Sequence, residues 1–264
     1  MSSSGSFVFG IRAFGSFIRI ESFNFDIGTM LDRYVFPPLP REDPWSVIPD
    51  IDVHLEHASE GIRILINQKL VALGETDQDA ILATVKALDD AVVQRLKDFR
   101  AVHAGAVLIE GCTVLFPGST HAGKSSLVSE FLRRGASCFS DEYALIDAEG
   151  LVHPYPRPLL LRDGRPKQSL VLPGELNTNF AANSAPVDWI IATEYVPGGE
   201  WKIQQTSKSE AVTLLLCNTP HEMARDPQLV DFFMRASANA RCCEGVRGDA
   251  AAAAHLLLDL INPK

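Results

Sequence analysis

The most constraining feature of the sequence is the segment GSTHAGKSS, which spans Gly118 to Ser126. It fits the P-loop pattern G-x-x-x-x-G-K-[ST], with Gly118, Gly123, Lys124 and Ser125 at the defined positions. The apolar run CTVLF precedes the loop, and SLVSEFL, whose apolar residues have helical spacing, follows it. A strand that leads through such a loop into a helix predicts an α/β fold that binds a nucleotide.

The chemistry of phosphate binding accounts for the composition of this loop. Glycines adopt backbone conformations closed to other residues, which lets successive N–H groups turn towards phosphate oxygens. We expect Lys124 to bind the β- and γ-phosphates and the Ser125 hydroxyl to bind Mg²⁺. His121 holds a variable position where it can touch a phosphate, although we favour a solvent-facing side chain. The predicted nucleotide-binding residues are Gly118, Ser119, Thr120, His121, Ala122, Gly123, Lys124, Ser125 and Ser126.

Charge and composition exclude several classes of partner. The chain of 264 residues carries 24 Lys and Arg against 33 Asp and Glu, a net charge of −9. Such an acidic protein is a poor match for nucleic acid or an anionic membrane. The five cysteines form no C-x-x-C pair, and neither a signal peptide nor an apolar run of about 18 residues is present. We therefore expect a reduced, cytoplasmic protein without zinc, nucleic-acid partner or membrane partner.

The first part of the chain, residues 1–98, is predicted to form a smaller, β-rich α+β region of unknown role. One or two strands are expected in residues 7–23, and five prolines make residues 36–50 an extended connection. Three short strands follow, and Asn67 with Gln68 is expected to turn the last two into a hairpin. Residues 76–99 read as a long amphipathic helix that Thr76 caps.

The second part, residues 99–264, is predicted to be the nucleotide-binding domain. Two strands flank the turn pair Glu110-Gly111, and the helix after the P-loop is expected to reach about Arg134. Pro197-Gly198-Gly199 is expected to join WIIATEYV and WKIQQ as a hairpin. Further strands are predicted at ASCFS, YALID and LVHPYP, and further helices from Ser207, from Asp226-Pro227 and over residues 249–261.

A magnesium nucleotide site needs an acidic residue beyond the loop, and two segments offer one. Asp141 and Glu142 end the strand-like run ASCFS, where adjacent carboxylates can bind metal and accept a proton from an attacking hydroxyl. A solvated acidic turn is the alternative for this pair. Asp147 begins DAEG, which fits a GTPase switch or a hairpin turn. We favour the turn, because the sequence contains no N-K-x-D guanine motif.

The stretch from His103 to Asp147 resembles the catalytic core of HPr kinase/phosphorylase and its relatives. It carries a histidine before the P-loop strand, Arg134-Gly135 after the P-loop helix, and the acidic pair Asp141-Glu142. The resemblance implies the fold shared with ATP-type phosphoenolpyruvate carboxykinases, a mixed sheet with flanking helices. A looser likeness to small HPr-kinase-like proteins continues to residue 262, and residues 1–98 show none.

The resemblance also implies roles for individual residues. Asp141 would be the general base that deprotonates the acceptor hydroxyl, and His103 would lie near it and orient it. Lys124 would hold the phosphates of ATP, while Ser125 and Glu142 would bind Mg²⁺. The family has a second aspartate where this chain has Glu142, so the role of Glu142 is less well defined than that of Asp141.

A second departure lies after this core, where the glycine-rich signature that helps HPr kinases bind their protein acceptor is missing. The chain reads YPRPLLLRDGRPK instead. Arg157 and Arg162 can clamp a transferred phosphate or an acidic acceptor, or they can belong to a solvated loop. For Arg165 and Lys167 we favour the solvated loop.

These observations predict an ATP- and Mg²⁺-dependent kinase that phosphorylates a serine-type hydroxyl of a peptide or protein. Small kinases of this appearance occur beside peptide-modification genes, including those for lasso peptides, so a ribosomally made peptide is a plausible acceptor by resemblance. The alternative is a non-catalytic ATP-binding module, or a degenerate ATPase, that positions a partner. A carboxykinase ranks low, and phosphorolysis stays open. The acceptor is unidentified, and the sequence allows a homo-oligomer without indicating one.

Overall fold

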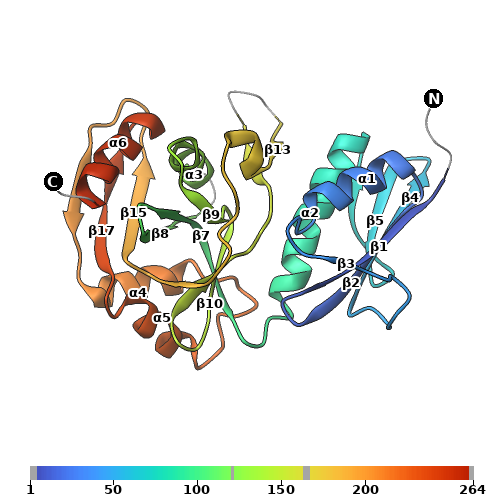
Figure 1. Ribbon diagram of the computed structural model, residues 1–264, viewed down its shortest axis with the longest axis horizontal. Helices are drawn as coiled ribbons and strands as arrows, with labels where there is room; N and C mark the ends of the chain where they lie inside the picture. The colour runs from blue at the N-terminus through green and yellow to red at the C-terminus, as the bar shows by residue number, and fades with distance from the viewer. Residues whose placement is uncertain (1–4, 120–121, 163–166, 262–264) are drawn as a thin grey trace. The chain divides into compact units, whose positions relative to one another are not determined.

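The computed structural model describes residues 5–119, 122–162 and 167–261. The chain divides into two compact units, Met1–Lys97 and Asp98–Lys264, each with its own sheet and helices (Figure 1). The fold is mixed α/β. In the described part of the chain, no helix is both long and apolar enough to cross a lipid bilayer.

The first unit contains a mixed sheet in the order β3-β1-β2-β4-β5-β6. Its strands are β1 (Phe7–Ala13), β2 (Ser16–Ser22), β3 (Arg41–Glu42), β4 (Ile51–Ala58), β5 (Gly61–Ile66) and β6 (Lys69–Gly74). The predicted hairpin turn is confirmed, because β5 pairs antiparallel with β6 and both Asn67 and Gln68 have positive φ, 50° and 66°. Consecutive left-handed residues suit the twist of a two-residue hairpin.

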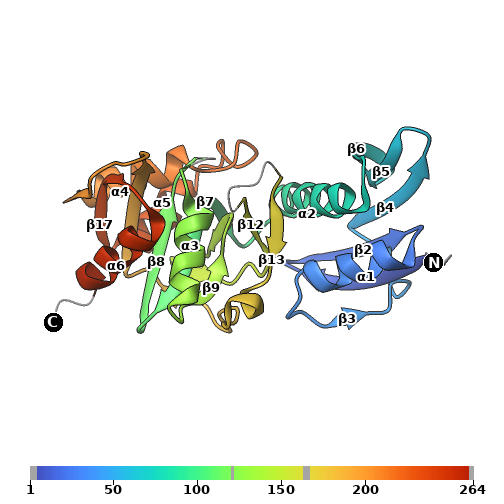
Figure 2. The ribbon, with the colours of Figure 1, turned by 90° about the horizontal axis from the view of Figure 1, so that it is seen from above.

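Two helices pack on this sheet, and each begins at a side-chain cap. Helix α1 (Phe25–Tyr34) lies over β1 and β2, and α2 (Asp77–Val93) lies over β5 and β6 (Figure 2). The predicted cap of α2 is confirmed, since Thr76 Oγ1 accepts from the Asp79 N–H at 3.2 Å. The predicted end at residue 99 is wrong. Bonds from Arg95 N to Val92 O and from Leu96 N to Val93 O tighten the last turn and end the helix early.

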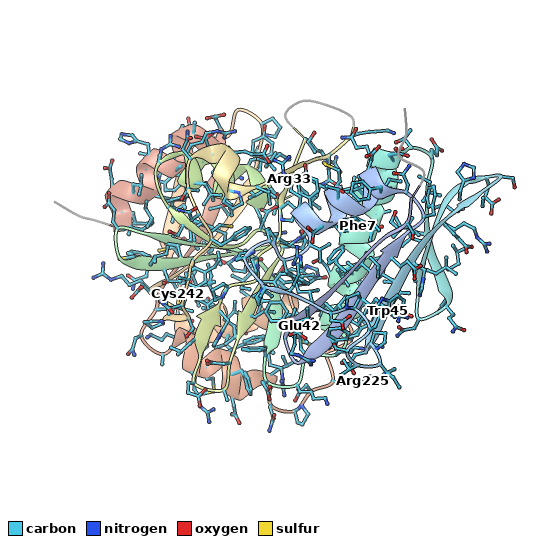
Figure 3. All side chains as sticks on the ribbon, turned by 45° about the vertical axis from the view of Figure 1, so that its right-hand side comes forward. Phe7, Arg33, Glu42, Trp45, Arg225 and Cys242 are labelled. Atoms are coloured by element: carbon cyan, nitrogen blue, oxygen red, sulfur yellow. The ribbon has the colours of Figure 1, made fainter. Side chains whose placement is uncertain are left out.

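The loop between β3 and β4 exposes large apolar side chains. Trp45 is 62% exposed and Ile48 is 92% exposed, and the Arg19 guanidinium stacks over the Trp45 ring at 4.6 Å (Trp45 is labelled in Figure 3). Arg19 also forms a two-pronged ion pair with Asp52, at 2.8 and 2.7 Å. This pairing holds the guanidinium in place over the indole ring.

The second unit is built on a larger mixed sheet in the order β14-β11-β10-β7-β8-β15-β17-β16, with β9 also paired to β7. Strand β8 is antiparallel to β7 and parallel to β15. The strands are β7 (Arg100–Ile109), β8 (Cys112–Pro117), β9 (Ser137–Ser140), β10 (Tyr143–Ile146), β11 (Leu151–His153), β14 (Ala185–Pro186), β15 (Trp189–Tyr195), β16 (Lys202–Gln205) and β17 (Arg241–Arg247). A separate hairpin joins β12 (Leu159–Leu161) to β13 (Ser169–Val171), and the 3₁₀ helix η1 (Pro173–Leu176) follows it.

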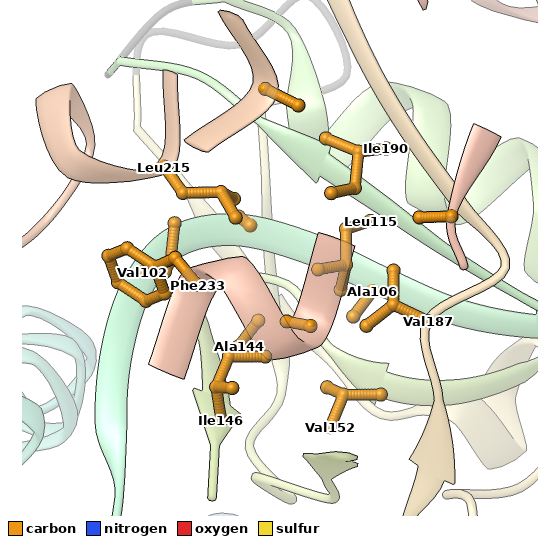
Figure 4. Packing of buried hydrophobic residues seen from close by; sticks show 14 of the residues in the cluster. Val102, Ala106, Leu115, Ala144, Ile146, Val152, Val187, Ile190, Leu215 and Phe233 are labelled. Carbon is orange, nitrogen blue, oxygen red and sulfur yellow. The ribbon is translucent and has the colours of Figure 1, made fainter. Parts of the chain in front are cut away.

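Helices cover both faces of this sheet. Helices α3 (Lys124–Arg133) and α6 (Ala250–Ile261) lie on one face, and α4 (Lys208–Cys217) and α5 (Leu229–Ser237) lie on the other (Figure 1). Leu115, Ile190 and Phe233 belong to the core on the α4 and α5 side (Figure 4). The opposite core contains Phe116 and Phe131. A strand buried on both faces shows little apolar–polar alternation, which explains the continuous apolar run TVLF in β8.

The predicted hairpin between WIIATEYV and WKIQQ is wrong. Strand β17 lies between these segments, parallel to β15 and antiparallel to β16. Because β15 pairs with β8 on one side and with β17 along seven residue pairs on the other, neither of its edges can take β16. The sequence RCCEGVR has few strongly apolar residues, so sequence patterning missed β17.

Two further local predictions in this unit are confirmed, and one helix begins later than predicted. The turn pair is confirmed, with φ of 50° at Glu110 and 81° at Gly111. The cap of α4 is confirmed as a capping box between Ser207 and Glu210. Helix α5 begins at Leu229 rather than at Asp226, whose carboxylate instead accepts from the Gln228 N–H at 2.8 Å.

Candidate active site

The loop from Gly118 leads from β8 directly into α3, the strand–loop–helix order that its motif requires. At its end Gly123 is left-handed, with φ of 79°, and no described side chain caps the helix. The first N–H groups of a helix have no partner within it, and the helix dipole is positive there. The beginning of α3 therefore offers a binding site for an anion.

Lys124 folds back along this loop. Its Nζ donates to the carbonyl oxygens of Gly118, at 2.7 Å, and Ser119, at 2.9 Å. Burial lowers the pKa of Lys124, although the nearby carboxylates of Glu142 and Asp141 oppose this shift. The ammonium group therefore lies between the loop and the acidic pair, where it can bridge a bound phosphate and both carboxylates.

Asp141 is fully buried between β9 and β10, with 0% of its surface exposed. Its Oδ2 accepts from the Leu160 N–H at 3.1 Å, whereas Oδ1 accepts no hydrogen bond of good geometry from the described residues. Burial raises the pKa of Asp141 to about 6, while the Arg157 charge, the Leu160 N–H and the Ser125 hydroxyl oppose the rise. A buried carboxylate beside the P-loop serine is poorly explained by the solvated turn that the sequence also allowed.

Glu142 differs from its neighbour because its side chain is 30% exposed and has charged partners. His103 Nδ1 lies 3.4 Å from Oε1, and Arg157 Nη1 lies 3.7 Å from Oε2. Burial by itself would raise the pKa of Glu142, but the interaction with His103 and the charges of Arg157 and Lys124 lower it overall. Glu142 is therefore held ionised, as a magnesium ligand must be.

His103 approaches Glu142 rather than Asp141, which differs from the expectation by resemblance. The register of β7 and β10 pairs His103 with Tyr143, and the two rings lie 4.6 Å apart. Asp141 and Glu142 lie between β9 and β10, and their side chains diverge: Glu142 lies beside His103, whereas Asp141 turns inwards to the Leu160 N–H. His103 is thus placed to orient the proposed metal ligand rather than the proposed base.

Arg157 and Arg162 have different environments. The Arg157 side chain is only 2% exposed, and its charge acts on both Asp141 and Glu142, so it does not belong to a solvated loop. Arg162 is exposed and lines a pocket of about 260 Å³ together with Lys124, Ser125 and Glu142. Of the two, only Arg162 stands at an open position where an acceptor or its phosphate can be met.

Three residues singled out in the sequence lie outside the described residues, namely Thr120, His121 and Arg165. Among the other loop residues, Ser126 is exposed at the first turn of α3 and also lines the pocket of about 260 Å³. Lys167 is exposed.

Asp147 forms the hairpin turn that the sequence favoured over a GTPase switch. Its Oδ1 accepts from the N–H groups of Glu149, at 3.0 Å, and Leu151, at 2.8 Å, and its Oδ2 lies 2.6 Å from His153 Nε2. Strands β10 and β11 pair antiparallel on either side of this turn. Asp147 is therefore committed to the turn and stands apart from the acidic pair.

Sequence reasoning missed Arg247, a buried guanidinium at the end of β17. Its Nη2 donates to Gly123 O at 2.8 Å, its Nε to Thr193 Oγ1 at 3.1 Å, and its Nη1 to Gly248 O at 3.0 Å. A β-carbon at Gly123 would come within 2.3 Å of Nη2, so only glycine fits against it. Arg247 is 1% exposed and its pKa is lowered by burial. It ties the end of the loop to two strands of the sheet.

The donor set fits a magnesium nucleotide better than a metal bound by protein alone. Within the described ranges, no three His, Cys, Asp or Glu side chains converge on a point. Magnesium in nucleotide sites commonly takes one or two protein ligands and completes its shell with phosphate oxygens and water. Ser125 and Glu142 can supply the protein ligands, and the uncapped start of α3 can supply N–H groups for the phosphates.

Comparison with known proteins adds little to this geometry. No family model matches the sequence, and no curated protein matches it. Among solved structures, the Hpr(Ser) kinase/phosphatase from Coxiella burnetii is similar to part of the chain, with 14% sequence identity and a TM-score of 0.30. The match covers 60% of this chain and 97% of that chain. At this level of similarity, the site has to be interpreted from its own residues.

Proposed function

We propose that the protein is an ATP- and Mg²⁺-dependent kinase that phosphorylates a serine-type hydroxyl of a peptide or protein. The observation that carries this proposal is the Asp141 carboxylate. It is fully buried, it has a raised pKa, and one of its oxygens lacks a hydrogen-bond partner among the described residues. Burying such a group is unfavourable for folding, and this cost is typical of a catalytic residue.

The residues around Asp141 supply the rest of a phosphotransfer site. The start of α3 and Lys124 would hold the phosphates, and Ser125 with Glu142 would hold the magnesium ion. When bound, the magnesium nucleotide supplies the phosphoryl group and the counter-charge for its transfer. Arg157 and His103 keep Glu142 ionised, and Arg162 lines the pocket at a position open to the acceptor.

Asp141 is suited to accept the proton of the acceptor hydroxyl. With a pKa of about 6, it is mostly ionised at neutral pH yet basic enough to take up a proton. Its bond from the Leu160 N–H holds one oxygen in place, so the other can point at an acceptor. Burial excludes water from competing for this oxygen.

The proposal is tested by incubating the purified protein with γ-labelled ATP, Mg²⁺ and a peptide extract of host cells. We expect label on a peptide or protein, acid-stable as a phosphoserine ester is, and identified by mass spectrometry. Label released only as inorganic phosphate would indicate an ATPase. Tight ATP binding without any labelled species would favour the non-catalytic ATP-binding module over the kinase.

A further inference from the structure

A second cavity, of about 760 Å³, lies on the other side of the P-loop from the acidic pair. In the sheet, β8 has β7 on one side, and β7 carries β10 and β9, which bracket Asp141 and Glu142. On its other side β8 has β15 and β17, whose residues line this cavity together with Gly118, Ser119 and Ala122 of the loop. The loop therefore separates two cavities that both reach it.

The strand register places a set of polar side chains on one wall of this cavity. Ala192 pairs with Glu244 across β15 and β17, and Gln204 of β16 also pairs with Glu244. Residues at paired positions share a face, as do residues two apart, so Glu194 joins this set. Ile190 and Cys242 show that this is the face packed against α4, since both lie in the core that contains Leu215.

The opposite face of the same strands belongs to the phosphate side. Thr193 and Arg247 are hydrogen-bonded there, and Arg247 holds the Gly123 carbonyl. Tyr195 borders both cavities. A ligand that lies over the loop can therefore reach from the start of α3 into the cavity beneath α4.

We propose that this cavity binds the nucleoside part of the nucleotide, with Glu194 and Glu244 directed at the ribose hydroxyls. The proposal rests on the kinase function proposed above. If the transferred phosphate lies at Asp141, the rest of the nucleotide must leave the loop on the other side, where this cavity begins. Its volume lies within the range of about 300–1,000 Å³ that is usual for small-molecule sites.

The chemistry of the wall favours a neutral group that donates hydrogen bonds. Two carboxylates repel a triphosphate, so they are unsuited to bind its charged end, but they accept hydrogen bonds from a ribose diol. Amides supply both donors and acceptors for the edge of a base. Gln204 Nε2 donates to Glu244 Oε1 at 3.5 Å, and Asn218 Nδ2 donates to Leu214 O at 2.9 Å. These bonds hold both amides at the wall.

A cationic segment of the acceptor is the competing occupant of an acidic cavity. Its hydroxyl would have to reach Asp141, which lies beyond β8 and β7 on the far side of the loop. The pocket of about 260 Å³ is the one lined by Glu142 and Leu160, the sequence neighbour and the hydrogen-bond partner of Asp141. The nucleoside is therefore the better match for the cavity beneath α4.

The test measures binding of Mg²⁺-ATP and Mg²⁺-tripolyphosphate by calorimetry, using the full chain, Glu194→Gln, Glu244→Gln and Ala192→Phe. Each Glu→Gln change should weaken ATP binding roughly tenfold, the order expected for a lost hydrogen bond to a charged group. The same changes should leave tripolyphosphate binding equal or tighter, because a repelling charge is gone. Ala192→Phe should fill the cavity and weaken only ATP binding. Glu200→Gln removes an equivalent charge from an exposed side chain outside the cavity and should leave the affinity for both ligands unchanged.

The outcomes separate this inference from the proposed function. If ATP and tripolyphosphate bind equally in the unaltered protein, or if the three variants leave ATP affinity unchanged, the nucleoside site is wrong while phosphate binding at the loop stands. If neither ligand binds, the proposed function itself fails. If the Glu variants weaken binding of a lysine-rich peptide and leave ATP affinity unchanged, the cavity is an acceptor site and our assignment is overturned.

Discussion

Among the single residues of the site, Asp141 is the most informative, because its carboxylate is fully buried. Ionised carboxylates are rarely buried without a partner, because desolvation disfavours the charged form. Asp141 has partial compensation from Arg157 and the Leu160 N–H, yet its pKa is still raised to about 6. The folded chain therefore maintains a carboxylate whose pKa suits the base that we propose.

The pH dependence of phosphoryl transfer follows from this pKa. A base works in its deprotonated form, so kcat/KM should rise with pH through about 6 and level off near neutrality. The measurement is transfer of label to a fixed acceptor between about pH 4.5 and 8. A profile that is flat across pH 6 would contradict the assignment of Asp141 as the base.

The raised pKa of Asp141 also predicts how the unfolding free energy changes with pH. Its pKa is higher in the folded protein than the ordinary aspartate value of 3.8, so between these two pKa values the folded state holds a proton that the unfolded chain releases. This contribution is present below about pH 4 and is lost as pH rises through about 6, at a cost of the order of 3 kcal/mol in unfolding free energy. Denaturant unfolding should show this slope for the unaltered protein and a shallower one for Asp141→Asn.

At the scale of elements, the loop and its helix depend on a strand that is distant in sequence. Arg247 of β17 hydrogen-bonds Gly123 at the start of α3, and it reaches β15 through Thr193. Lysine has no planar fork and cannot make these three contacts at once. The loop conformation is therefore set by tertiary contacts as well as by its own glycines.

Arg247→Lys should weaken ATP binding and lower the melting temperature. The loss of charge-assisted bonds to Thr193 and Gly248 is expected to cost about 1.5–3 kcal/mol. Calorimetric ATP titration and thermal unfolding measure the two effects. Arg241→Lys, an exposed position on the same strand, is the matched control and should change neither. Unaltered ATP affinity in Arg247→Lys would show that the arginine does not support the loop.

Local signals account for the elements that sequence reasoning placed correctly. The cap at Thr76, the capping box at Ser207 and the turn at Asn67 each involve residues a few positions apart, so their chemistry is visible in the sequence. Strand β17 and the role of Arg247 were missed because their partners lie far along the chain. The failed hairpin has the same cause, since only the tertiary fold places β17 between β15 and β16.

The candidate site also combines features that are visible in the sequence with features that only the tertiary fold sets. The P-loop and Asp141-Glu142 stand out by residue type and spacing, and the structure brings Lys124 close to both carboxylates. The contact of His103 with Glu142 and the burial of Arg157 are consequences of tertiary packing. Such contacts have no periodic signature in the sequence.

At the scale of the whole molecule, the residues of the candidate site all belong to the unit Asp98–Lys264. The unit Met1–Lys97 has its own sheet, its own helices and an exposed apolar loop at Trp45 and Ile48. We propose that the second unit catalyses phosphoryl transfer and does not merely bind ATP. Binding and transfer must therefore be measured separately in the same protein.

Comparing Asp141→Asn with the exposed control Asp259→Asn separates ATP binding from phosphoryl transfer. The measurement pairs calorimetric ATP affinity with single-turnover transfer of label to the identified acceptor. We predict that Asp141→Asn keeps ATP affinity within about threefold and slows transfer by at least about 100-fold, the range for loss of a general base. The Asp259→Asn control should match the unaltered protein in both. Unchanged transfer in Asp141→Asn would contradict the account.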